Sequence, residues 1–453
     1  MDISNKTFVV VGTGKSGVAA AELLLRHAKK VYLYDGNEAL DVAAFRKQHQ
    51  SLNAVELILG TLPAKIETTL DIAVLSPGVP LDIPVVEQMK AQGICIWGEI
   101  ELAYVLGKGK VVAITGTNGK TTTTTLVGQI MARHFAKVQV VGNIGIPYTS
   151  VVEDTTEDTV VVAEISSFQL ETIQTFAPKA AAILNITPDH LNRHHTMENY
   201  IAAKESIVKN QSKEDVCVLN YNDEVLRDFG KTLEQNIIYF SSTEVLEEGL
   251  YLDGNEIMWA RNGGSEPIIS VEELHILGAH NYENAMAAIA LCDGMGVPMQ
   301  TICDGLRAFH AVEHRIEFVC KKNDIAFYND SKGTNPDAAI KGICAMNRKT
   351  VLIGGGYDKE STYDEWIDSF HGKVKKLILI GQTAQKIAAC AKAHGFTDYV
   401  FADSLEEAIT IAYKTAEPGE AVLLSPACAS WGMFDNYEQR GDIFKEYVRN
   451  LKE

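Results

Sequence analysis

The chain has 453 residues, of which 46% are hydrophobic and 22% charged, a balance that excludes wholesale disorder and fibrous structure. This length predicts about three domains. The formal net charge of −18 disfavours nonspecific binding to nucleic acid or anionic membranes, so an anionic ligand requires locally placed positive groups.

The cysteine pattern and the first residues indicate the compartment. The eight cysteines lie far apart between Cys95 and Cys428, without a C-x-x-C pair or the Cys/His spacing of zinc sites, so we expect reduced thiols. The N-terminus passes directly into a strand-like run, and no apolar stretch approaches the roughly 20 residues of a membrane helix. We therefore expect a cytoplasmic monomer without nucleic-acid or membrane partners.

The first hundred residues alternate short β-branched runs with helical patterns. Four of these runs are typical of buried parallel strands: Phe8–Val11, Val31–Tyr34, Ala73–Leu75 and Ile94–Trp97. The pattern predicts a doubly wound α/β domain. A polar, glycine-containing stretch at Gly107–Lys110 places its end near residue 107, which gives a first domain at 1–107.

Two further series of elements follow. The second series comprises the expected strands Val111–Thr115, Val138–Val141, Thr159–Ala163, Ala180–Leu184, Val216–Leu219 and Ile237–Phe240, a β segment at Gly249–Ala260 and a helix at Asn281–Met295. After a break around Leu306–Arg315, the third series has strands at Ile325–Tyr328, Thr350–Ile353, Leu377–Ile380 and Ala421–Leu424. We expect α/β domains at 108–311 and 312–453.

Residues 111–122, VVAITGTNGKTT, combine a strand, a glycine-rich loop and the start of a helix. Such a loop directs backbone N–H groups at phosphate oxygens, while Lys120 would neutralise the terminal phosphates and Thr121 would offer its hydroxyl to Mg²⁺. Ile114 occupies the first glycine position of the strict G-x-x-x-x-G-K-[ST] form, so the motif alone leaves an ordinary strand–helix turn open. Thr123–Thr125 are expected on the helix surface.

A second glycine-rich loop, Gly12-Thr-Gly14-Lys-Ser-Gly17, also follows a strand, and Asp35 ends the next strand. This pattern satisfies the dinucleotide fingerprint, in which glycines admit a pyrophosphate and an acid binds a ribose hydroxyl. NAD and UDP both present these groups, so either ligand fits. Glycines that serve only tight strand–helix packing are the third interpretation. The loop Ser76-Pro-Gly78 ends another strand, where ligands of open sheets bind.

Polar side chains also end the central strands. Glu164 follows a run of valines and is a candidate Mg²⁺ ligand, because Mg²⁺ prefers oxygen ligands and works with substrate phosphates. A structural salt bridge is the alternative for Glu164. The segment Asn185–His190 follows the next strand, and Lys204 lies on the amphipathic helix after it. By residue type alone, His190 and Lys204 are most often structural or solvated.

The third domain has polar loops at its strand ends, namely His314–Glu317, Asn329–Pro336, Gly354–Lys359 and Ser425–Trp431, the last leading through Phe434 and Tyr437 to Arg440. Their hydroxyls, lysines and glycines suit a small anionic ligand. A serine hydrolase is disfavoured, because no G-x-S-x-G elbow surrounds Ser425 or Ser430.

The ordered motifs GTNGKTT, EISSFQLE, LNITPDH with AAKE, HNYENA, HRIE, NDSKGTNP and SPACASW resemble those of the Mur ligase family over nearly the whole chain. GTNGK[ST] belongs to the wider superfamily, whereas NDSKGTN with SPACAS marks the branch that adds D-glutamate. The resemblance implies three α/β domains: a Rossmann-like uridine nucleotide-binding domain, a central P-loop ATPase-type domain and a C-terminal Rossmann-like domain.

The same resemblance implies a reaction and its cofactors. It predicts an ATP-dependent ligase that joins D-glutamate to UDP-N-acetylmuramoyl-L-alanine through an acyl phosphate, in peptidoglycan precursor synthesis. The residues implied for ATP are Gly116, Thr117, Asn118, Gly119, Lys120, Thr121, Thr122, Asn281, Arg315 and Asp330. The catalytic residues implied are Lys120, Glu164, His190 and Lys204.

Metal and substrate ligands follow from the resemblance as well. Two Mg²⁺ sites would use Thr121, Glu164, His190 and Lys204, the lysine as a CO₂-derived carbamate, since an ammonium cannot ligate a cation. The residues implied for the UDP-sugar are Gly14, Lys15, Ser16, Asp35, Ser76, Pro77, Gly78, Asn143 and His190. Those implied for D-glutamate are Lys332, Thr334, Lys359, Ser430 and Tyr437. Tyr437 stands where phenylalanine is common, which makes a backbone N–H contact the alternative there.

Other functions compete with this interpretation. A sister ligase that adds another amino acid, or a folylpolyglutamate synthase, would share the central motifs, but the C-terminal motifs disfavour both. An NAD-dependent dehydrogenase would explain Gly12–Gly17 and leave the phosphate loop and the third domain without a purpose. A nucleotide-gated binding protein would retain ATP affinity without turnover, which the intact Lys120, Glu164, His190 and Lys204 disfavour.

Overall fold

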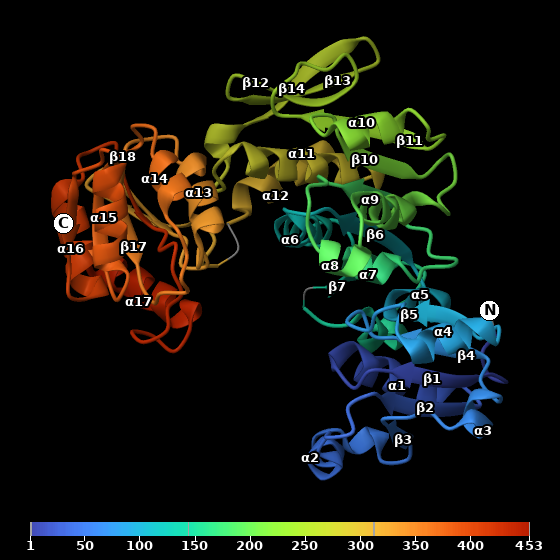
Figure 1. The fold of residues 1–453 in the computed structure, drawn as a ribbon. Helices are drawn as coiled ribbons and strands as arrows, with labels where there is room; N and C mark the ends of the chain where they lie inside the picture. Colours follow the sequence, from blue (N-terminus) through green and yellow to red (C-terminus); the bar gives the residue numbers. More distant parts are fainter. Residues whose placement is uncertain (1, 144, 311–312, 453) are drawn as a thin grey trace. The chain divides into compact units, whose positions relative to one another are not determined.

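The computed structural model describes residues 2–143, 145–310 and 313–452, which are organised around three β-sheets (Figure 1). They form two compact units, Met1–Ile269 with Glu283–Leu306, and Ser270–Tyr282 with Arg307–Glu453. The expected boundary between the second and third domains, at residues 311 and 312, lies outside the described residues. Within the described ranges, no helix is long and apolar enough to cross a membrane.

The N-terminal sheet is parallel and has the strand order β3-β2-β1-β4-β5. Its strands are β1 (Thr7–Val11), β2 (Lys30–Asp35), β3 (Glu56–Leu59), β4 (Ile72–Leu75) and β5 (Cys95–Gly98). Its helices are α1 (Lys15–His27), α2 (Val42–Gln48), α3 (Ala64–Glu67), α4 (Pro84–Ala91) and α5 (Glu99–Leu106). Buried residues of α1 and α5 cover one face, and those of α3 and α4 cover the other, as doubly wound topology requires.

Helix α5 joins this sheet to the central one through two buried carboxylates. Glu99 accepts hydrogen bonds from the backbone N–H and the hydroxyl of Thr149, at 2.6 and 2.8 Å. Glu101 accepts from the backbone N–H groups of Gln174, Thr175 and Phe176. Burial raises the pKa of Glu99, although the Thr149 bonds oppose this shift. These contacts explain why the N-terminal and central sheets belong to one compact unit.

The central sheet has nine strands in the order β14-β13-β12-β11-β10-β9-β6-β8-β7. Its strands are β6 (Lys110–Thr115), β7 (Val138–Gly142), β8 (Val160–Glu164), β9 (Ala180–Ile183), β10 (Val216–Asn220), β11 (Asn236–Ser241), β12 (Gly249–Asp253), β13 (Glu256–Arg261) and β14 (Gly264–Ser270). Its helices are α6 (Lys120–Met131), α7 (Ser167–Leu170), α8 (Leu191–His194), α9 (Met197–Glu205), α10 (Glu224–Gly230), α11 (Ala279–Gly294) and α12 (Met299–Ala308). Strand β6 lies between β8 and β9, and all three are parallel. The loops that leave these strands therefore meet at the carboxyl end of the sheet, hereafter called the sheet edge.

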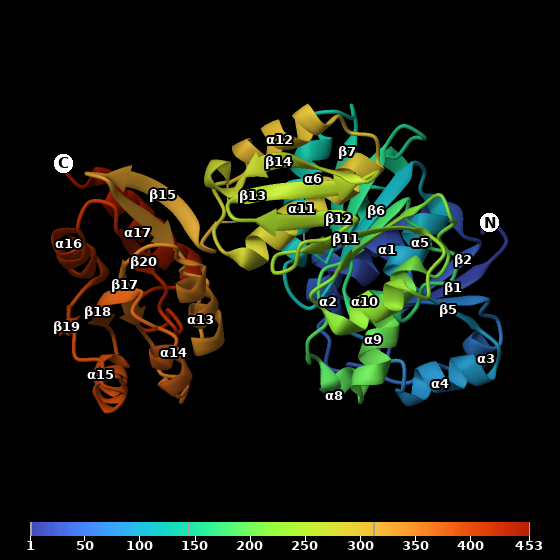
Figure 2. The same cartoon turned by 90° about the horizontal axis from the view of Figure 1, so that it is seen from above.

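The third sheet has the order β15-β16-β20-β17-β18-β19. Its strands are β15 (Glu317–Lys322), β16 (Ile325–Asn329), β17 (Thr350–Gly355), β18 (Val374–Ile380), β19 (Tyr399–Phe401) and β20 (Ala421–Leu424). Its helices are α13 (Pro336–Ala345), α14 (Asp364–Asp368), α15 (Ala384–Ala393), α16 (Leu405–Thr415) and α17 (Tyr437–Asn450). Figure 2 shows α13, α14 and α15 on one face, and α16 and α17 pack on the other.

The expected buried strands are all present, and the predicted β segment Gly249–Ala260 is the hairpin β12–β13. Four observed strands were not predicted: β3, β14, β15 and β19. Each of the four lies at the edge of its sheet. The expectation that Thr123–Thr125 lie on a helix surface is wrong for Thr123 and Thr124, which are fully buried.

Candidate functional site

The phosphate loop is a turn in which glycine is a steric requirement. Gly119 has φ +86°, and a Cβ there would lie 2.4 Å from Oδ1 of Asn284 on α11. The same Asn284 oxygen accepts a hydrogen bond from the buried hydroxyl of Thr123, at 3.2 Å. Helix α11 therefore packs directly against the start of α6, and the first turn of α6 presents the N–H groups that attract an anion.

The loop that follows β9 supports the phosphate loop. The carbonyl of Asn185 accepts from Thr117 N–H at 2.9 Å, and its side-chain oxygen accepts from Asn118 N–H at 2.8 Å. The hydroxyl of Thr117 in turn accepts from Thr187 N–H and contacts the hydroxyl of Tyr200. Sequence reasoning did not single out Asn185, although its position at the end of a central strand was the available signal.

Two lysines converge on one carbonyl of the phosphate loop. Lys120 Nζ donates to the Gly116 carbonyl at 2.8 Å, and Lys204 Nζ donates to the same oxygen at 2.9 Å. Lys204 is only 1% exposed. Burial, together with the charge of Lys120, lowers the pKa of Lys204 to about 7, and Asp189 opposes this shift. Near neutral pH, a large share of the Lys204 amine is therefore uncharged and nucleophilic.

Glu164 ends β8, directly beside the phosphate-loop strand, where it pairs in register with Ile114. Its side chain is buried, and Oε1 accepts from Asn143 Nδ2 at 2.7 Å. The buried Oε2 has no hydrogen-bond partner among the described residues. A buried carboxylate oxygen without a partner is costly. The salt-bridge alternative has no support, and a cation bound to this oxygen would satisfy it, so the donor set fits Mg²⁺.

Two histidines close to this edge differ in environment. His190, at the start of α8, has φ +51°; its half-exposed imidazole lies 3.4 Å from the Asp189 carboxylate and packs against Phe168. His194, which the sequence analysis passed over, is buried, with Nε2 2.9 Å from the Ser167 hydroxyl. Burial lowers the pKa of His194. His190 is therefore the histidine that remains accessible to a ligand.

In the N-terminal glycine loop, one glycine is packed tightly against the backbone and another faces open space. A Cβ at Gly17 would lie 1.9 Å from the Gly12 carbonyl oxygen, whereas a Cβ at Gly14 would have no heavy atom within 4 Å. Asp35 Oδ2 accepts from the N–H and the hydroxyl of Thr13, at 2.9 and 2.6 Å. Partial burial raises the pKa of Asp35, but these bonds outweigh it and the net pKa is lowered. Close packing against the Gly12 carbonyl therefore requires glycine at position 17. The ionised Asp35 carboxylate stabilises the neighbouring turn through its two hydrogen bonds with Thr13, next to Gly14.

The loops after β1 and β4 lie side by side at the carboxyl edge of the N-terminal sheet. The Ser76 hydroxyl donates to the Gly12 carbonyl at 3.4 Å. Three residues further on, Val79 O accepts from Arg193 Nη2 at 2.9 Å, and the same nitrogen pairs with Glu171 at 2.7 Å. The structure thus brings Ser76, Pro77 and Gly78 close to helix α8, which His190 precedes.

In the second compact unit, the loops after β16, β17 and β20 share one sheet edge. Asp330 is buried, and its carboxylate accepts from the Ser425 hydroxyl at 2.6 Å and from Ile316 N–H at 3.3 Å. Burial raises the pKa of Asp330 to about 7, against the effect of these bonds. The exposed Arg315 lies between His314, with φ +64°, and Ile316, with φ +47°. Strained backbone of this kind concentrates at functional sites.

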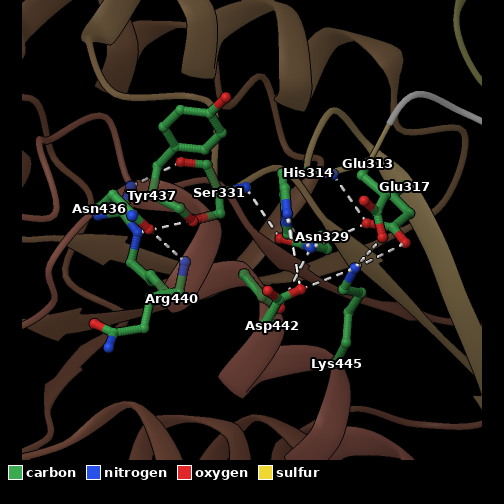
Figure 3. Close-up of polar contacts among 12 residues, drawn as sticks. Glu313, His314, Glu317, Asn329, Ser331, Asn436, Tyr437, Arg440, Asp442 and Lys445 are labelled. Atoms are coloured by element: carbon green, nitrogen blue, oxygen red, sulfur yellow. Dashed lines mark hydrogen bonds and ion pairs between the residues drawn. The ribbon is translucent and has the colours of Figure 1, made fainter. Parts of the chain in front are cut away.

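A buried arginine that the sequence analysis mentioned without a role connects the loops after β16 and β20 with the start of α17 (Figure 3). Arg440 donates to the Ser331 hydroxyl and carbonyl, at 2.9 and 2.7 Å, and to the Cys428 carbonyl at 3.2 Å. Ser331 donates onward to the Tyr437 carbonyl at 2.7 Å. Burial lowers the pKa of Arg440 to about 10, so it remains a cation at neutral pH. Its fixed fork holds the loops in register.

The remaining predicted residues of this unit lie around that network. Lys332 Nζ lies 5.6 Å from the centre of the Tyr437 ring, and Lys332 N–H donates to the His314 carbonyl. Ser430 is buried, whereas Lys359 is exposed and lies 4.8 Å from the Trp431 ring centre. Thr334 is partly exposed on the same loop as Lys332. Asn281 is buried and donates to the Leu277 carbonyl at 2.8 Å.

Family models match most of the chain in three consecutive segments. The MurD-like N-terminal domain of Mur ligases matches residues 6–98, the Mur ligase middle domain 114–292, and the Mur ligase glutamate ligase domain 314–428. The chain is 53% identical over 453 residues to the UDP-N-acetylmuramoylalanine–D-glutamate ligase of Lachnoclostridium phytofermentans, with 100% of both proteins covered. It is 43% identical to the ligase of the same name from Clostridioides difficile, with 100% of both covered.

Solved structures agree on the fold. The UDP-N-acetylmuramate–alanine ligase of Thermotoga maritima aligns with a TM-score of 0.57 at 20% identity, covering 99% of this chain and 100% of that one. A pseudomurein peptide ligase type C from Methanothermus fervidus gives 0.53 at 18% identity, with 99% and 100% covered. The predicted three-domain α/β fold is thereby confirmed. With full-length relatives at 53% identity, the chain belongs to the Mur ligase family.

Proposed function

We propose that this chain is the ATP-dependent ligase that joins D-glutamate to UDP-N-acetylmuramoyl-L-alanine in peptidoglycan precursor synthesis. The observation that carries the proposal is the edge of the central sheet, where the phosphate loop, the buried Glu164 and the buried Lys204 meet. The names of its full-length relatives support the same substrates. We further propose that it works in the cytoplasm, where ATP is available, and as a monomer.

The three domains divide the substrates in this proposal. Residues 1–107 bind the UDP-sugar, 108–311 bind ATP and 312–453 bind D-glutamate. Gly14, Lys15, Ser16, Asp35, Ser76, Pro77, Gly78, Asn143 and His190 contact the UDP-sugar. Gly116–Thr122, with Asn281, Arg315 and Asp330, contact ATP. Lys332, Thr334, Lys359, Ser430 and Tyr437 contact D-glutamate.

Metal ligation follows from the oxygen donors at the sheet edge. Thr121, Glu164, His190 and Lys204, the last as a carbamate, hold Mg²⁺, which offsets the charge of phosphates and carboxylate brought together. The pKa of about 7 supports carbamylation, because only the neutral amine of Lys204 attacks CO₂. As the new N–C bond forms, the neutral amine releases one proton, and the resulting carbamate carries a single negative charge shared by two oxygens. The unpartnered Oε2 of Glu164 supports the same site.

The reaction then follows from what each group holds in place. The L-alanine carboxylate of the UDP-substrate attacks the γ-phosphate of ATP, which releases ADP and leaves an acyl phosphate. Lys120 stabilises the charge that spreads over the transferred phosphoryl group. The neutral amine of D-glutamate attacks the acyl carbon, phosphate departs with the bonding pair, and the amine loses a proton as the amide forms.

The test is phosphate release from ATP in the presence of UDP-N-acetylmuramoyl-L-alanine, with D-glutamate, L-glutamate, L-alanine or L-lysine as the amine. We expect phosphate release only when D-glutamate is the amine, and we expect the amide product to form with it. Release with a different amine would move the chain to a sister ligase. Absence of release with every amine would refute the ligase assignment and return attention to hydride transfer or to binding without turnover.

Carbamylation has a separate test. We expect ¹³C-labelled bicarbonate to yield a carbamate signal in the NMR spectrum of the wild-type chain and none in Lys204→Arg, because the arginine side chain has no neutral amine. Depletion of CO₂ should lower turnover, and bicarbonate should restore it. A Lys204→Arg spectrum that retains the signal would assign the carbamate elsewhere.

A further inference from the structure

Two short helices of the C-terminal unit bring four ligating side chains together away from the proposed ligase site. Asp364 and Asp368 lie one turn apart on α14, and Cys390 and His394 lie one turn apart on α15 and its C-cap. The His394 N–H donates to the Cys390 carbonyl at 3.1 Å, which fixes this helical spacing. One ligand atom each from Asp364, Cys390 and His394 lies within 4.8 Å of the others.

The imidazole of His394 is held between two carboxylates. Its Nε2 lies 3.0 Å from Asp364 Oδ1, and its Nδ1 lies 2.7 Å from Asp368 Oδ1. If a cation replaces the proton on Nε2, Asp368 still accepts the Nδ1–H and fixes both the tautomer and the ring orientation. This carboxylate–histidine pairing is the usual support of a histidine that ligates a metal.

The thiol completes a mixed donor set. Cys390 is partly buried and, like Phe396, packs against the apolar cluster that contains Trp366 and Phe370. An ion that binds here must displace the thiol proton, because the thiolate is the form that ligates a metal. Lys386, the neighbouring cation on α15, pairs with Asp358 at 3.1 Å. Because Lys386 is paired with Asp358, it does not neutralise the carboxylates of Asp364 and Asp368 beside His394.

We propose that Asp364, Cys390 and His394 form a binding site for a thiophilic divalent cation, with Zn²⁺ as the expected ion and Asp368 as the residue that orients the histidine. Thiolate, imidazole and carboxylate are the ligands that Zn²⁺ prefers, and three protein ligands leave a fourth position for water. Among the described residues, this is the one place where three Asp, Glu, His or Cys ligand atoms converge so closely. The bound ion would link α14 to α15.

The spacing of residues in the sequence does not indicate this site, because Cys390 and His394 lie on α15 and its C-cap whereas Asp364 lies on a different helix, α14. The site also differs chemically from the edge that holds Glu164, since a thiolate suits Zn²⁺ and is not a ligand that Mg²⁺ favours. The competing interpretation is an ion-pair cluster in which His394, as a cation, bridges the two aspartates and the thiol takes no part. The two interpretations differ in whether Cys390 binds the ion.

The decisive experiment titrates the reduced, metal-free full chain with Co²⁺ and Zn²⁺ in the absence of nucleotide. We expect one equivalent of Co²⁺ to produce a thiolate-to-metal charge-transfer band that Zn²⁺ abolishes. Cys390→Ser should remove the band and weaken Zn²⁺ binding at least about tenfold. Asp368→Asn should retain the band while weakening affinity roughly 10- to 100-fold, as expected for a residue that orients a ligand. Cys344→Ser, which removes an exposed thiol elsewhere, is the matched control and should change neither.

A second readout follows each thiol separately. Alkylation mapped by mass spectrometry should show that Zn²⁺ protects Cys390 and leaves the exposed Cys95 and Cys344 reactive. A charge-transfer band that persists in Cys390→Ser, equal protection of all three thiols, or no metal binding by the intact chain would each overturn the proposal. Thermal unfolding of the metal-free variants confirms that they are folded. None of these measurements depends on ligase turnover, so the result stands apart from the function proposed above.

Discussion

At the scale of single residues, the unusual feature is an amine buried beside another cation. Lys204 and Lys120 donate to one carbonyl oxygen, and desolvation of Lys204 together with the charge of Lys120 lowers its pKa to about 7. An ordinary ion pair would have shifted the pKa upward. The environment of Lys204 thus favours the chemistry of a neutral amine over that of a charged one.

This pKa predicts how stability depends on pH. The unfolded Lys204 titrates at its ordinary value of 10.5, so between about pH 7 and 10.5 the unfolded chain binds a proton that the folded chain lacks. The penalty for burying Lys204 is full below pH 7 and disappears as the pH rises toward 10.5. In CO₂-free buffer, we expect Lys204→Met to increase the free energy of unfolding near pH 7 by roughly 1–4 kcal/mol.

Urea unfolding of both proteins across this range measures the effect. The difference between Lys204→Met and the wild-type chain should shrink toward pH 10. A gap that is constant with pH would show that Lys204 is protonated normally in the folded chain. The same variant should lose ligase turnover by about 10²- to 10³-fold, comparable to the loss of one group that stabilises a transition state.

Asp330 predicts the opposite pH dependence in the second unit. Burial raises its folded pKa to about 7 above the ordinary 3.8, so between these values the folded chain binds the additional proton. The stabilisation that comes from this proton is complete below pH 3.8 and is lost as the pH rises through 7. The loss lowers the free energy of unfolding by up to about 4 kcal/mol. Asp330→Asn should flatten the fall in unfolding free energy between pH 4.5 and 7. Exposed Asp398→Asn is the control, and an equal slope in Asp330→Asn would contradict the assignment.

At the scale of elements, the sheets explain which strands the sequence reveals. Strands β1, β6, β8, β16 and β20 are buried over most or all of their length, so their sequences are continuous apolar runs. The unpredicted strands β3, β14, β15 and β19 are edges, with one side unpaired and several residues accessible. Polar residues interrupt the apolar pattern in β14 and β15, whereas β3 and β19 are largely apolar runs of only four and three residues.

The N-terminal glycine loop offers a matched pair of substitutions. Gly17→Ala would place a Cβ 1.9 Å from the Gly12 carbonyl oxygen, so we expect overpacking between α1 and β1 and a loss of about 1–3 kcal/mol. Gly14→Ala has open space and φ −73°, so stability should stay unchanged while the KM for the UDP-substrate rises. Chemical denaturation and steady-state kinetics separate the two effects. An unaltered KM in Gly14→Ala would leave packing as the sole role of this motif.

At the scale of the whole molecule, an anionic protein binds anionic nucleotides through local groups. The net charge is −18, yet the first turn of α6, Lys120 and an unpartnered carboxylate oxygen suited to Mg²⁺ lie at one sheet edge. A ligand that binds only the folded state stabilises it by mass action, by about 2.7 kcal/mol at 100 times its Kd. Mg²⁺ with ADP should therefore raise the Tm of the wild-type chain.

Glu164→Gln should reduce the part of this shift that depends on Mg²⁺, because the amide preserves the shape of the side chain and removes the charge. ADP without Mg²⁺ should stabilise both proteins by similar amounts. Thermal unfolding with and without the metal tests this directly. A full Mg²⁺-dependent shift in Glu164→Gln would remove Glu164 from the metal site.

The order of motifs by itself determined the fold class, the family and the existence of a phosphate loop, because strand periodicity and glycine-rich loops are local properties of the chain. Contacts between distant residues were decided by the tertiary structure alone. Lys204 meets a carbonyl 88 residues away because β6 lies between β8 and β9, and Asp364 meets His394 because α14 packs beside α15. Burial, pKa and shared ligands depend on which elements become neighbours, and sequence spacing does not encode that adjacency.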